Sequence, residues 1–453
     1  MMTKILIAAS ILIIGYNQVE CKENEDWVEE VIEENENLDE HTINPSFDNK
    51  NEEPGGIGDL SSFFNIAYHF EDISADKFTM KVINLDEFNE IFFKKKSDEK
   101  KAKMLIENEV KYMEIFAKSS KPHFPIVHKC YINDRNYYII FDRLDFDLGD
   151  HSFMQAFVEA PLLEKLNLML EMAKGVQTIH TPEKTVKETD GKEDKSQLNV
   201  THNDIKPENF MLSVESPPRV KIINLGLVRP IGETIRYGTK LYMPPEKINK
   251  PGFGAQTSDD IWSLGITFGE LLNNDKEWLV NQFIEEESKE NKGNKENKEN
   301  KGNKGNKGNK GNKGNNENNI FDKKFYENLI NELKENLLNI GKNKEDNSGA
   351  YENWKELIEY ICDDMLQVER DKRKTINDTV KKLEDLILNL KKNKSSSSSG
   401  IEQKPQNNEN SFYPFIINKL KDKERTKFED KYINEDFELS KLLTNKNKKN
   451  NII

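Results

Sequence analysis

Four polar side chains within eight residues carry the chemistry that this sequence most clearly offers. The stretch "HNDIKPEN" at 202–209 contains His202, Asp204, Lys206 and Asn209. Asp204 can accept a hydroxyl proton or orient an attacking oxygen, Lys206 can neutralise a transferred phosphoryl group, and Asn209 can ligate a metal ion through its amide oxygen. Phosphoryl transfer requires positioning and charge neutralisation more than covalent help, so the stretch is typical of such a site. The alternative interpretation of this stretch is a solvated turn, because turns use the same residue types.

The elements that must position these residues are predicted from apolar periodicity. Two strands around a turn are expected over 63–83 and a buried strand over 137–144. One helix is expected between these strands, over 98–118. Further helices are expected after them, over 162–180, 258–272, 321–340 and 352–391. Because most strands lie early and most helices late, the chain is predicted to be an α+β protein in two parts with a cleft between them.

Composition limits the partners and divides the chain of 453 residues. A net charge of −14 argues against nucleic acid as the main partner, because phosphate binding requires a basic surface. Segment 22–54 is predicted to be an acidic disordered linker, and 392–453 a polar C-terminal tail. Two inserts are expected in the helical part: a charged one at 181–198 and a disordered Lys/Asn/Gly-rich one at 288–319.

The N-terminus has the pattern of a secretory signal peptide. Lys4 precedes an apolar run from Ile5 to Tyr16, which is too short to span a bilayer comfortably. We expect residues 1–21 to be removed by cleavage after Cys21, and the mature chain to carry no transmembrane span and to enter the secretory pathway, where it is secreted or kept in an organelle. A signal anchor and a buried N-terminal element remain open as alternatives.

Five motifs resemble the eukaryotic protein kinases, in that family's order, from about residue 56 to 375. "HNDIKPEN" is similar to the catalytic loop His-Arg-Asp-Leu-Lys-Pro-Glu-Asn, and Lys206 resembles the serine/threonine branch. The other four motifs are Asn224-Leu225-Gly226 for Asp-Phe-Gly, Pro244-Pro245-Glu246 for Ala-Pro-Glu, "DDIWSLG" at 259–265, and "QVERDKRKT" at 367–375. The resemblance implies a bilobal protein kinase-like fold with a small β-rich N-lobe at 55–144 and a larger helical C-lobe at 145–391.

The resemblance also implies an ATP site. Lys81 in "FTMK" would hold the α and β phosphates and pair with Glu109 in "LIENEVKYM", for which Glu107 is a near competitor. Gly56 and Gly58 fit a glycine loop over the phosphates, although its third glycine is replaced.

At the back of the same site, Phe141 falls at the gatekeeper position and Asp142 to Leu144 form the hinge to the adenine. The catalytic roles are carried over to Asp204 and Lys206, and the metal-binding roles to Asn209 and Asn224.

Two departures from the family pattern concern activity. Asn203 replaces the arginine that clasps a phosphorylated activation loop, so phosphorylation at Thr234 is not expected to gate activity. Asn224 keeps an oxygen ligand but loses the negative charge that magnesium prefers. Such a loss costs on the order of 2–4 kcal/mol, or roughly 30- to 1000-fold in rate. We therefore expect weakened Mg²⁺ binding, with Mn²⁺ as a possible substitute.

Three interpretations remain open. The first is a secreted pseudokinase that binds ATP and a protein partner but transfers phosphate poorly. The second is an active atypical serine/threonine kinase acting on a protein substrate. The third is an acidic, non-catalytic interaction protein, adhesive or calcium-binding, suggested by 22–54 and by the Lys/Asn tracts. The signal-like start and the low-complexity repeats also resemble the apicomplexan rhoptry kinase group. The sequence does not indicate an oligomeric state.

Overall fold

The computed structural model describes the chain in sixteen segments, which are residues 22–23, 43–44, 61–68, 75–84, 99–117, 123–133, 136–142, 144–181, 199–214, 217–234, 238–249, 253–273, 277–286, 321–343, 350–397 and 413–423. The predicted signal peptide 1–21 and the glycine-loop residues Gly56 and Gly58 lie outside them. The insert 288–319 also lies outside, as does all of 181–198 except Thr181.

The N-terminal part is built on one sheet. Its strand order, within the described residues, is β1-β5-β6-β4-β3-β2. The strands are β1 (Lys22–Glu23), β2 (Ile43–Asn44), β3 (Ser61–Tyr68), β4 (Ala75–Asn84), β5 (Val127–Asn133) and β6 (Asn136–Asp142). β4 lies between β3 and β6, and this register sets Lys81 opposite Phe63 and Ile139. Within the predicted linker 22–54, the described residues of β1 and β2 add backbone pairs at the two edges of this sheet.

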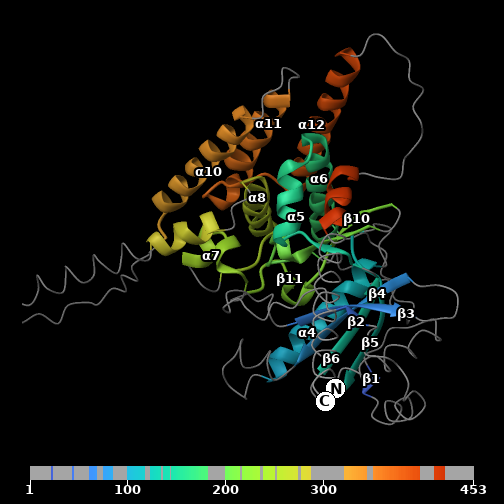
Figure 1. Ribbon diagram of the computed structural model, residues 1–453. Helices are drawn as coiled ribbons and strands as arrows, with labels where there is room; N and C mark the ends of the chain where they lie inside the picture. The colour runs from blue at the N-terminus through green and yellow to red at the C-terminus, as the bar shows by residue number, and fades with distance from the viewer. Residues whose placement is uncertain are drawn as a thin grey trace, which may run out of the picture.

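One helix, α4 (Glu99–Ala117), packs beside this sheet (Figure 1). Its buried face follows helical spacing through Ile106, Val110 and Met113. Phe116, near its end, stacks on Phe124 with ring centroids 4.8 Å apart. This apolar face fixes the rotation of α4 and therefore decides which of its acidic residues points inward.

The C-terminal part is mostly helical (Figure 1). Its helices include α5 (His151–Glu159), α6 (Leu162–His180), α7 (Pro245–Asn249), α8 (Thr257–Asn273), α10 (Lys323–Asn343), α11 (Ala350–Glu359) and α12 (Ile376–Ser397). From Asp259 to Leu272 every residue of α8 is buried, so this helix is the centre of the C-terminal core. The two-part α+β architecture predicted from the sequence is confirmed.

Short strands and turns join the two parts and carry the loops of interest. β7 (Phe146–Asp147), β9 (Phe210–Ser213) and β10 (Arg219–Ile222) form one small sheet, and β8 (Val200–Thr201) pairs with β11 (Arg229–Pro230). Single helical turns follow at η4 (Pro207–Asn209), η5 (Leu225–Leu227) and η6 (Lys240–Tyr242). The stretch 202–209 therefore lies between β8 and β9 and is anchored on both sides.

The helical pattern predicted over 352–391 is interrupted in the structure. After α11 the chain forms a π-helical turn η7 (Tyr360–Met365) and a short turn η8 (Arg370–Lys372) before α12 begins. The break places Arg373 where its side chain reaches Glu246, at 2.7 Å. The turns between α11 and α12 thus accompany a tertiary ion pair that a continuous helix pattern does not predict. Among the described residues, no helix has the length and apolar character needed to cross a membrane.

The predicted polar tail also needs correction. α12 runs past residue 391 to Ser397, and a further helical segment at 413–423 packs against the body. Its apolar side is fully covered: Tyr413 and Ile416 are each 0% exposed. The Glu164 carboxylate of α6 accepts hydrogen bonds from the backbone N–H groups of Phe415 and Ile416, at 3.1 and 3.2 Å, which satisfies donors at the start of this helix.

We predict that Ile416→Ala lowers the free energy of unfolding by about 2–5 kcal/mol, because it leaves a cavity at a fully buried site. Thermal or urea unfolding of the whole chain measures this. Lys421→Ala, an exposed position on the same segment, is the matched control and should change stability by less than about 0.5 kcal/mol. Equal, small effects of both variants would show that 413–423 does not belong to the folded body.

Candidate functional site

Lys81 and Glu109 form a buried ion pair between β4 and α4. The Lys81 ammonium donates to Glu109 Oε1 at 2.7 Å, and the two residues are only 4% and 5% exposed. Glu107, the competitor for this role, is exposed. Two residues along a helix point to different faces, so only one of them can meet Lys81. The structure brings Lys81 together with Glu109.

The same ammonium reaches across to the C-terminal part. Lys81 Nζ donates to Asn224 Oδ1 at 2.5 Å, and Asn224 Nδ2 donates in turn to Asn209 Oδ1, also at 2.5 Å. Asn209 Nδ2 then donates to the Asp204 backbone oxygen at 2.6 Å and to Asp204 Oδ2 at 3.0 Å. Four residues selected from the sequence, Lys81, Asn224, Asn209 and Asp204, therefore converge in one hydrogen-bonded chain.

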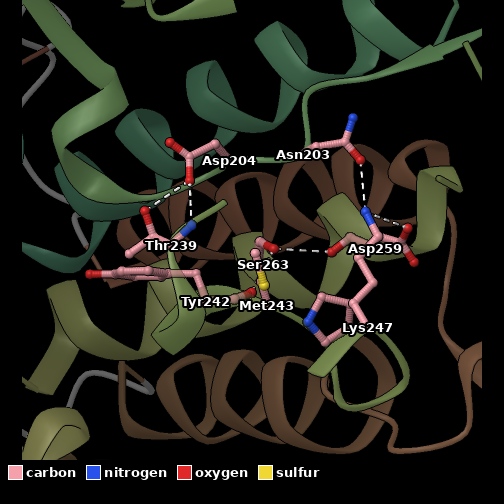
Figure 2. A pocket seen from close by; sticks show the side chains of 9 residues that line it. Asn203, Asp204, Thr239, Tyr242, Met243, Lys247, Asp259 and Ser263 are labelled. Atoms are coloured by element: carbon pink, nitrogen blue, oxygen red, sulfur yellow. Dashed lines mark hydrogen bonds and ion pairs between the residues drawn. The ribbon is translucent and has the colours of Figure 1, made fainter. Parts of the chain in front are cut away.

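Asp204 is held in one orientation by the segment that follows Gly238. Its Oδ1 accepts from the Thr239 backbone N–H at 2.9 Å and from the Thr239 hydroxyl at 2.8 Å (Figure 2). Because Oδ2 accepts from Asn209, both carboxylate oxygens are positioned from two directions. This arrangement suits a carboxylate that must orient a hydroxyl group rather than rotate freely.

Lys206 lies two residues further along and is 5% exposed. Within the described part of the chain, no hydrogen-bond or ion-pair partner of its ammonium is found. A buried ammonium is costly unless an anion compensates it. A phosphoryl group brought beside Asp204 would supply that anion.

The loop carrying these groups is anchored by the buried carboxylate of Asp260 in α8. It accepts from the backbone N–H groups of His202 and Asn203, at 2.7 and 2.8 Å, and lies 2.8 Å from His180 Nε2. Burial opposes the charged form of Asp260. The hydrogen bond and electrostatic attraction from His180, together with the contacts from His202, outweigh this effect and hold the pKa of Asp260 below its usual value. The anchor therefore stays anionic at neutral pH.

His202 is buried beside the Asp260 carboxylate, and its ring contacts backbone groups and not a reacting group. Burial lowers its pKa, so the ring is neutral at pH 7. One ring nitrogen, Nδ1, accepts from the Asp204 N–H at 3.2 Å, and Nε2 lies 3.2 Å from the Ile223 carbonyl. The imidazole thus links the catalytic-loop segment to the strand that leads to Asn224.

Asn224 has a left-handed backbone, with φ 60° and ψ 57°. Asn is one of the few side chains that tolerate this conformation. α4 closes on the turn that follows: Asn108 Nδ2 donates to the carbonyls of Gly226 and Val228 at 3.2 and 3.0 Å. A Cβ at Gly226 would lie 3.1 Å from the Leu105 carbonyl, so glycine permits this close approach.

The hinge residues lie at the back of the site. Phe141 and Leu144 are each 1% exposed. The Asp142 carboxylate accepts from the Ile126 N–H at 3.0 Å and lies 3.3 Å from Lys221 Nζ. These bonds hold the Asp142 carboxylate, and the Asp142 backbone N–H donates to the Ile126 carbonyl at 3.2 Å. Gly56 and Gly58 lie outside the described residues.

Two residues in the site were not singled out from the sequence. Asn108 is one, because its role depends on the carbonyls of a distant turn. Lys247 is the other: its ammonium donates to Asn203 Oδ1 at 2.8 Å. No local signal marks Lys247, because its burial depends on contacts with Asn203 and Asp259 elsewhere in the sequence.

Two lobes, a buried lysine–glutamate pair and a positioned aspartate joined to that pair through Asn224 and Asn209 define a protein kinase-like site. Comparison with known proteins agrees: the family model of the protein kinase domain matches residues 79–383. The chain belongs to the protein kinase family. Protein kinase domains in general use ATP and a divalent metal ion.

Individual relatives match only in part. The chain is 40% identical over 82 residues to the dual specificity mitogen-activated protein kinase kinase sek-1 of Caenorhabditis elegans (17% of this chain, 24% of that protein). It is 39% identical over 74 residues to myosin light chain kinase A of Dictyostelium discoideum (15% and 24%). Against the human serine/threonine-protein kinase ULK3 it is 24% identical over 193 residues (41% and 36%). The chain thus spans about a quarter to a third of the length of these relatives.

We predict that Glu109→Gln weakens ATP binding about 10-fold, whereas Glu107→Gln leaves it unchanged. The first removes the buried partner of Lys81 and the second changes an exposed side chain on the same helix. ATP-dependent thermal shift and calorimetric titration of the full chain measure both. Equal effects of the two substitutions would contradict the assignment of Glu109.

Proposed function

We propose that this chain binds ATP in the cleft between its lobes and transfers phosphate to serine or threonine hydroxyls of proteins only weakly, as a pseudokinase does. Support for ATP binding comes from Lys81, paired with Glu109 and directed into the cleft, and from Lys206. Support for a protein substrate comes from the family and from Asp204, whose carboxylate is aligned to orient a hydroxyl.

The bond between Asn224 and Asn209 carries the second half of the proposal. These residues stand at the two metal-binding positions, and the Asn224 NH₂ donates to the Asn209 oxygen that a metal would need. Asn224 Oδ1, the other ligand oxygen, is engaged by Lys81. A metal ion must therefore break two hydrogen bonds and then coordinate neutral amides, which Mg²⁺ favours less than carboxylate. Among the described residues, no cluster of three His, Cys, Asp or Glu offers another metal site.

The residues fit a divalent ion only after rearrangement. Asn209 Oδ1 and Asn224 Oδ1 would hold it, with the phosphates supplying the remaining oxygens and the negative charge. When bound, the ion neutralises charge on the transferred phosphoryl group. Mn²⁺ tolerates nitrogen- and amide-rich surroundings better than Mg²⁺, so we propose that it supports the residual activity better.

An active atypical serine/threonine kinase is the second candidate. The observation that favours it is the completeness of the remaining site: the Lys81–Glu109 pair, the doubly held Asp204 and the buried Lys206 are all in place. The third interpretation, a non-catalytic acidic interaction protein, now has little to support it, because the kinase-type residues converge.

We predict that Asn224→Asp raises the rate of phosphate transfer roughly 30- to 1000-fold, because it restores a charged metal ligand. The measurement is radiolabel transfer from ATP to dephosphorylated casein, and to the chain itself, across Mg²⁺ and Mn²⁺ titrations. Asn377→Asp, an exposed position on α12, adds the same charge elsewhere and should have no effect.

Two further results complete this experiment. Asp204→Ala should abolish transfer by the Asn224→Asp chain. If the unaltered chain already transfers phosphate as fast as Asn224→Asp, the second candidate replaces the first. If neither chain shows transfer or an ATP-dependent thermal shift, the proposed function is wrong.

We also propose that the chain is secreted or delivered to a secretory organelle, as a rhoptry-kinase-like effector would be. The support is the sequence of residues 1–21, which lies outside the described structure. Expression in insect cells should yield a product in the medium whose N-terminal sequence begins at Lys22. Leu12→Arg, which interrupts the apolar run, should abolish cleavage and secretion. An uncleaved, membrane-bound product would indicate a signal anchor instead.

A further inference from the structure

Asn203, the residue before Asp204, is bonded on every side by the protein itself. Its backbone is left-handed, with φ 68°. Its Nδ2 donates to the carbonyls of Thr201 and Leu227, both at 3.0 Å, and its Oδ1 accepts from Lys247 at 2.8 Å. The Leu227 bond joins the catalytic loop to the beginning of the activation segment (224–246), and the Lys247 bond joins it to the residue just after the end.

Lys247 is a buried cation with two partners. Besides donating to Asn203, its ammonium lies 3.1 Å from Asp259 Oδ2, and the side chains of Lys247 and Asp259 are 7% and 2% exposed. In Figure 2 the ammonium stands between the Asn203 amide and the Asp259 carboxylate, at the other end of the pocket from Asp204. The ammonium is compensated by Asp259 and donates to the Asn203 amide, so its loss would leave a buried acceptor on Asn203 without a donor.

The ion pair continues into a line of alternating charge. Asp259 Oδ1 accepts from Arg370 Nη2 at 2.6 Å, and the Arg370 guanidinium lies 3.3 Å from Glu246. Glu246 in turn pairs with Arg373 at 2.7 Å. Burial raises the pKa of Asp259, while the charges of Lys247 and Arg370 favour its anionic form. Five alternating charges therefore fasten the end of the activation segment to α8 and to the η8 turn.

The other side of the activation segment is fastened by backbone bonds. Gly232 N–H donates to the Ala255 carbonyl at 2.8 Å, and Ala255 N–H donates to the Glu233 carbonyl at 2.9 Å. Thr234 forms an antiparallel bridge with Gly254. Both described parts of the segment, before 235 and after 237, are thus anchored to the region around the start of α8.

We infer that Lys247 is a positioning residue for Asp204: its ammonium permanently joins the catalytic loop to the activation segment and α8, and so replaces the phosphate that would otherwise have to join them. This inference rests on the proposed function and names how that site is regulated. A phosphate group can be added and removed, whereas the Lys247 ammonium is a permanent part of the chain. The catalytic loop is therefore held in its position without phosphorylation at Thr234.

The test uses the full chain with Asn224→Asp, in which transfer is expected to be measurable. Lys247→Met should lower kcat at least about 10-fold, since a loop displaced by an ångström loses that much or more. The Kd for ATP should stay within about 2-fold, because Lys81 and the hinge are untouched. Lys247→Arg, which keeps the charge and the donors, should recover most of kcat. Thr234→Glu and Thr234→Ala should leave kcat unchanged.

Lys165→Met is the matched control for a merely structural effect. Lys165 is also buried, at 3% exposed, but it lies in α6 and donates to the Val158 carbonyl. It should lower Tm as Lys247→Met does, without changing kcat at a temperature where both variants are folded. If Lys247→Met fails to fold, Lys247→Gln keeps a donor for Asn203, loses the charge facing Asp259, and should still lower kcat.

Hydrogen exchange provides a readout that needs no activity. Amides of the catalytic loop, residues 199–209, should exchange faster in Lys247→Met and not in Lys165→Met. Unchanged loop protection and unchanged kcat in Lys247→Met, while Asp204→Ala abolishes transfer, would overturn the inference and leave the proposed function standing. A large effect of Thr234→Glu would overturn it as well. If the loop loses protection in Lys247→Met but no phosphate transfer is found, the inference about Lys247 stands and the proposed kinase activity is wrong.

Discussion

The Lys81 ammonium is the interaction on which the rest of the site depends, because it contacts both lobes at once. It pairs with Glu109 of α4 at 2.7 Å and donates to Asn224 of the C-lobe at 2.5 Å. The site contains two lysines, Lys81 and Lys206, and two carboxylates, Glu109 and Asp204, so its formal charges sum to zero. Of these, Lys81 and Glu109 form an ion pair. An aspartate at 224 would leave one excess negative charge for a cation to neutralise. With asparagine the site is already neutral, and the attraction for a divalent ion is correspondingly weaker.

The amide at 224 also fits its neighbours better than a carboxylate would when no metal is bound. It accepts from Lys81 and donates to Asn209 through opposite ends of one group. A carboxylate has no hydrogen to donate, so Asn209 would have to turn its own NH₂ away from Asp204. The amide at 224 therefore stabilises the hydrogen-bonded chain between Lys81 and Asn209. Under the proposed function the same substitution also weakens metal binding, so both effects favour a site that stays assembled without a cation.

Much of the fold and of the site could be predicted from the sequence, because the patterns that indicate them lie within short stretches of the chain. Lys206 and Asn209 are fixed relative to Asp204 by a few bonds of chain, and α8 shows its burial in its composition. Glu109 and Glu107 could not be separated, because the choice depends on how α4 rotates against the sheet. Lys247 and Arg370 were missed for a similar reason: each looks like a surface cation until Asp259 is placed between them. Segment 413–423 falls within the predicted polar tail because the sequence around it is polar, although it holds Tyr413, Phe415, Ile416, Ile417 and Leu420. Only their tertiary contacts show that most of these residues are buried.

Different kinds of interaction hold the two ends of the active site. At the metal end, neutral amides satisfy one another and reduce the need for a cation. At the far end of the pocket, a line of alternating buried charges ties Asn203 to the end of the activation segment. Removing Lys247 would leave Asp259 with Arg370 as its remaining cation, but it would leave Asn203 Oδ1 without its donor, so the tie to the catalytic loop depends on Lys247. A site built in this way has little free energy to gain from an added metal or phosphate. Its geometry is set by the contacts of the folded chain itself.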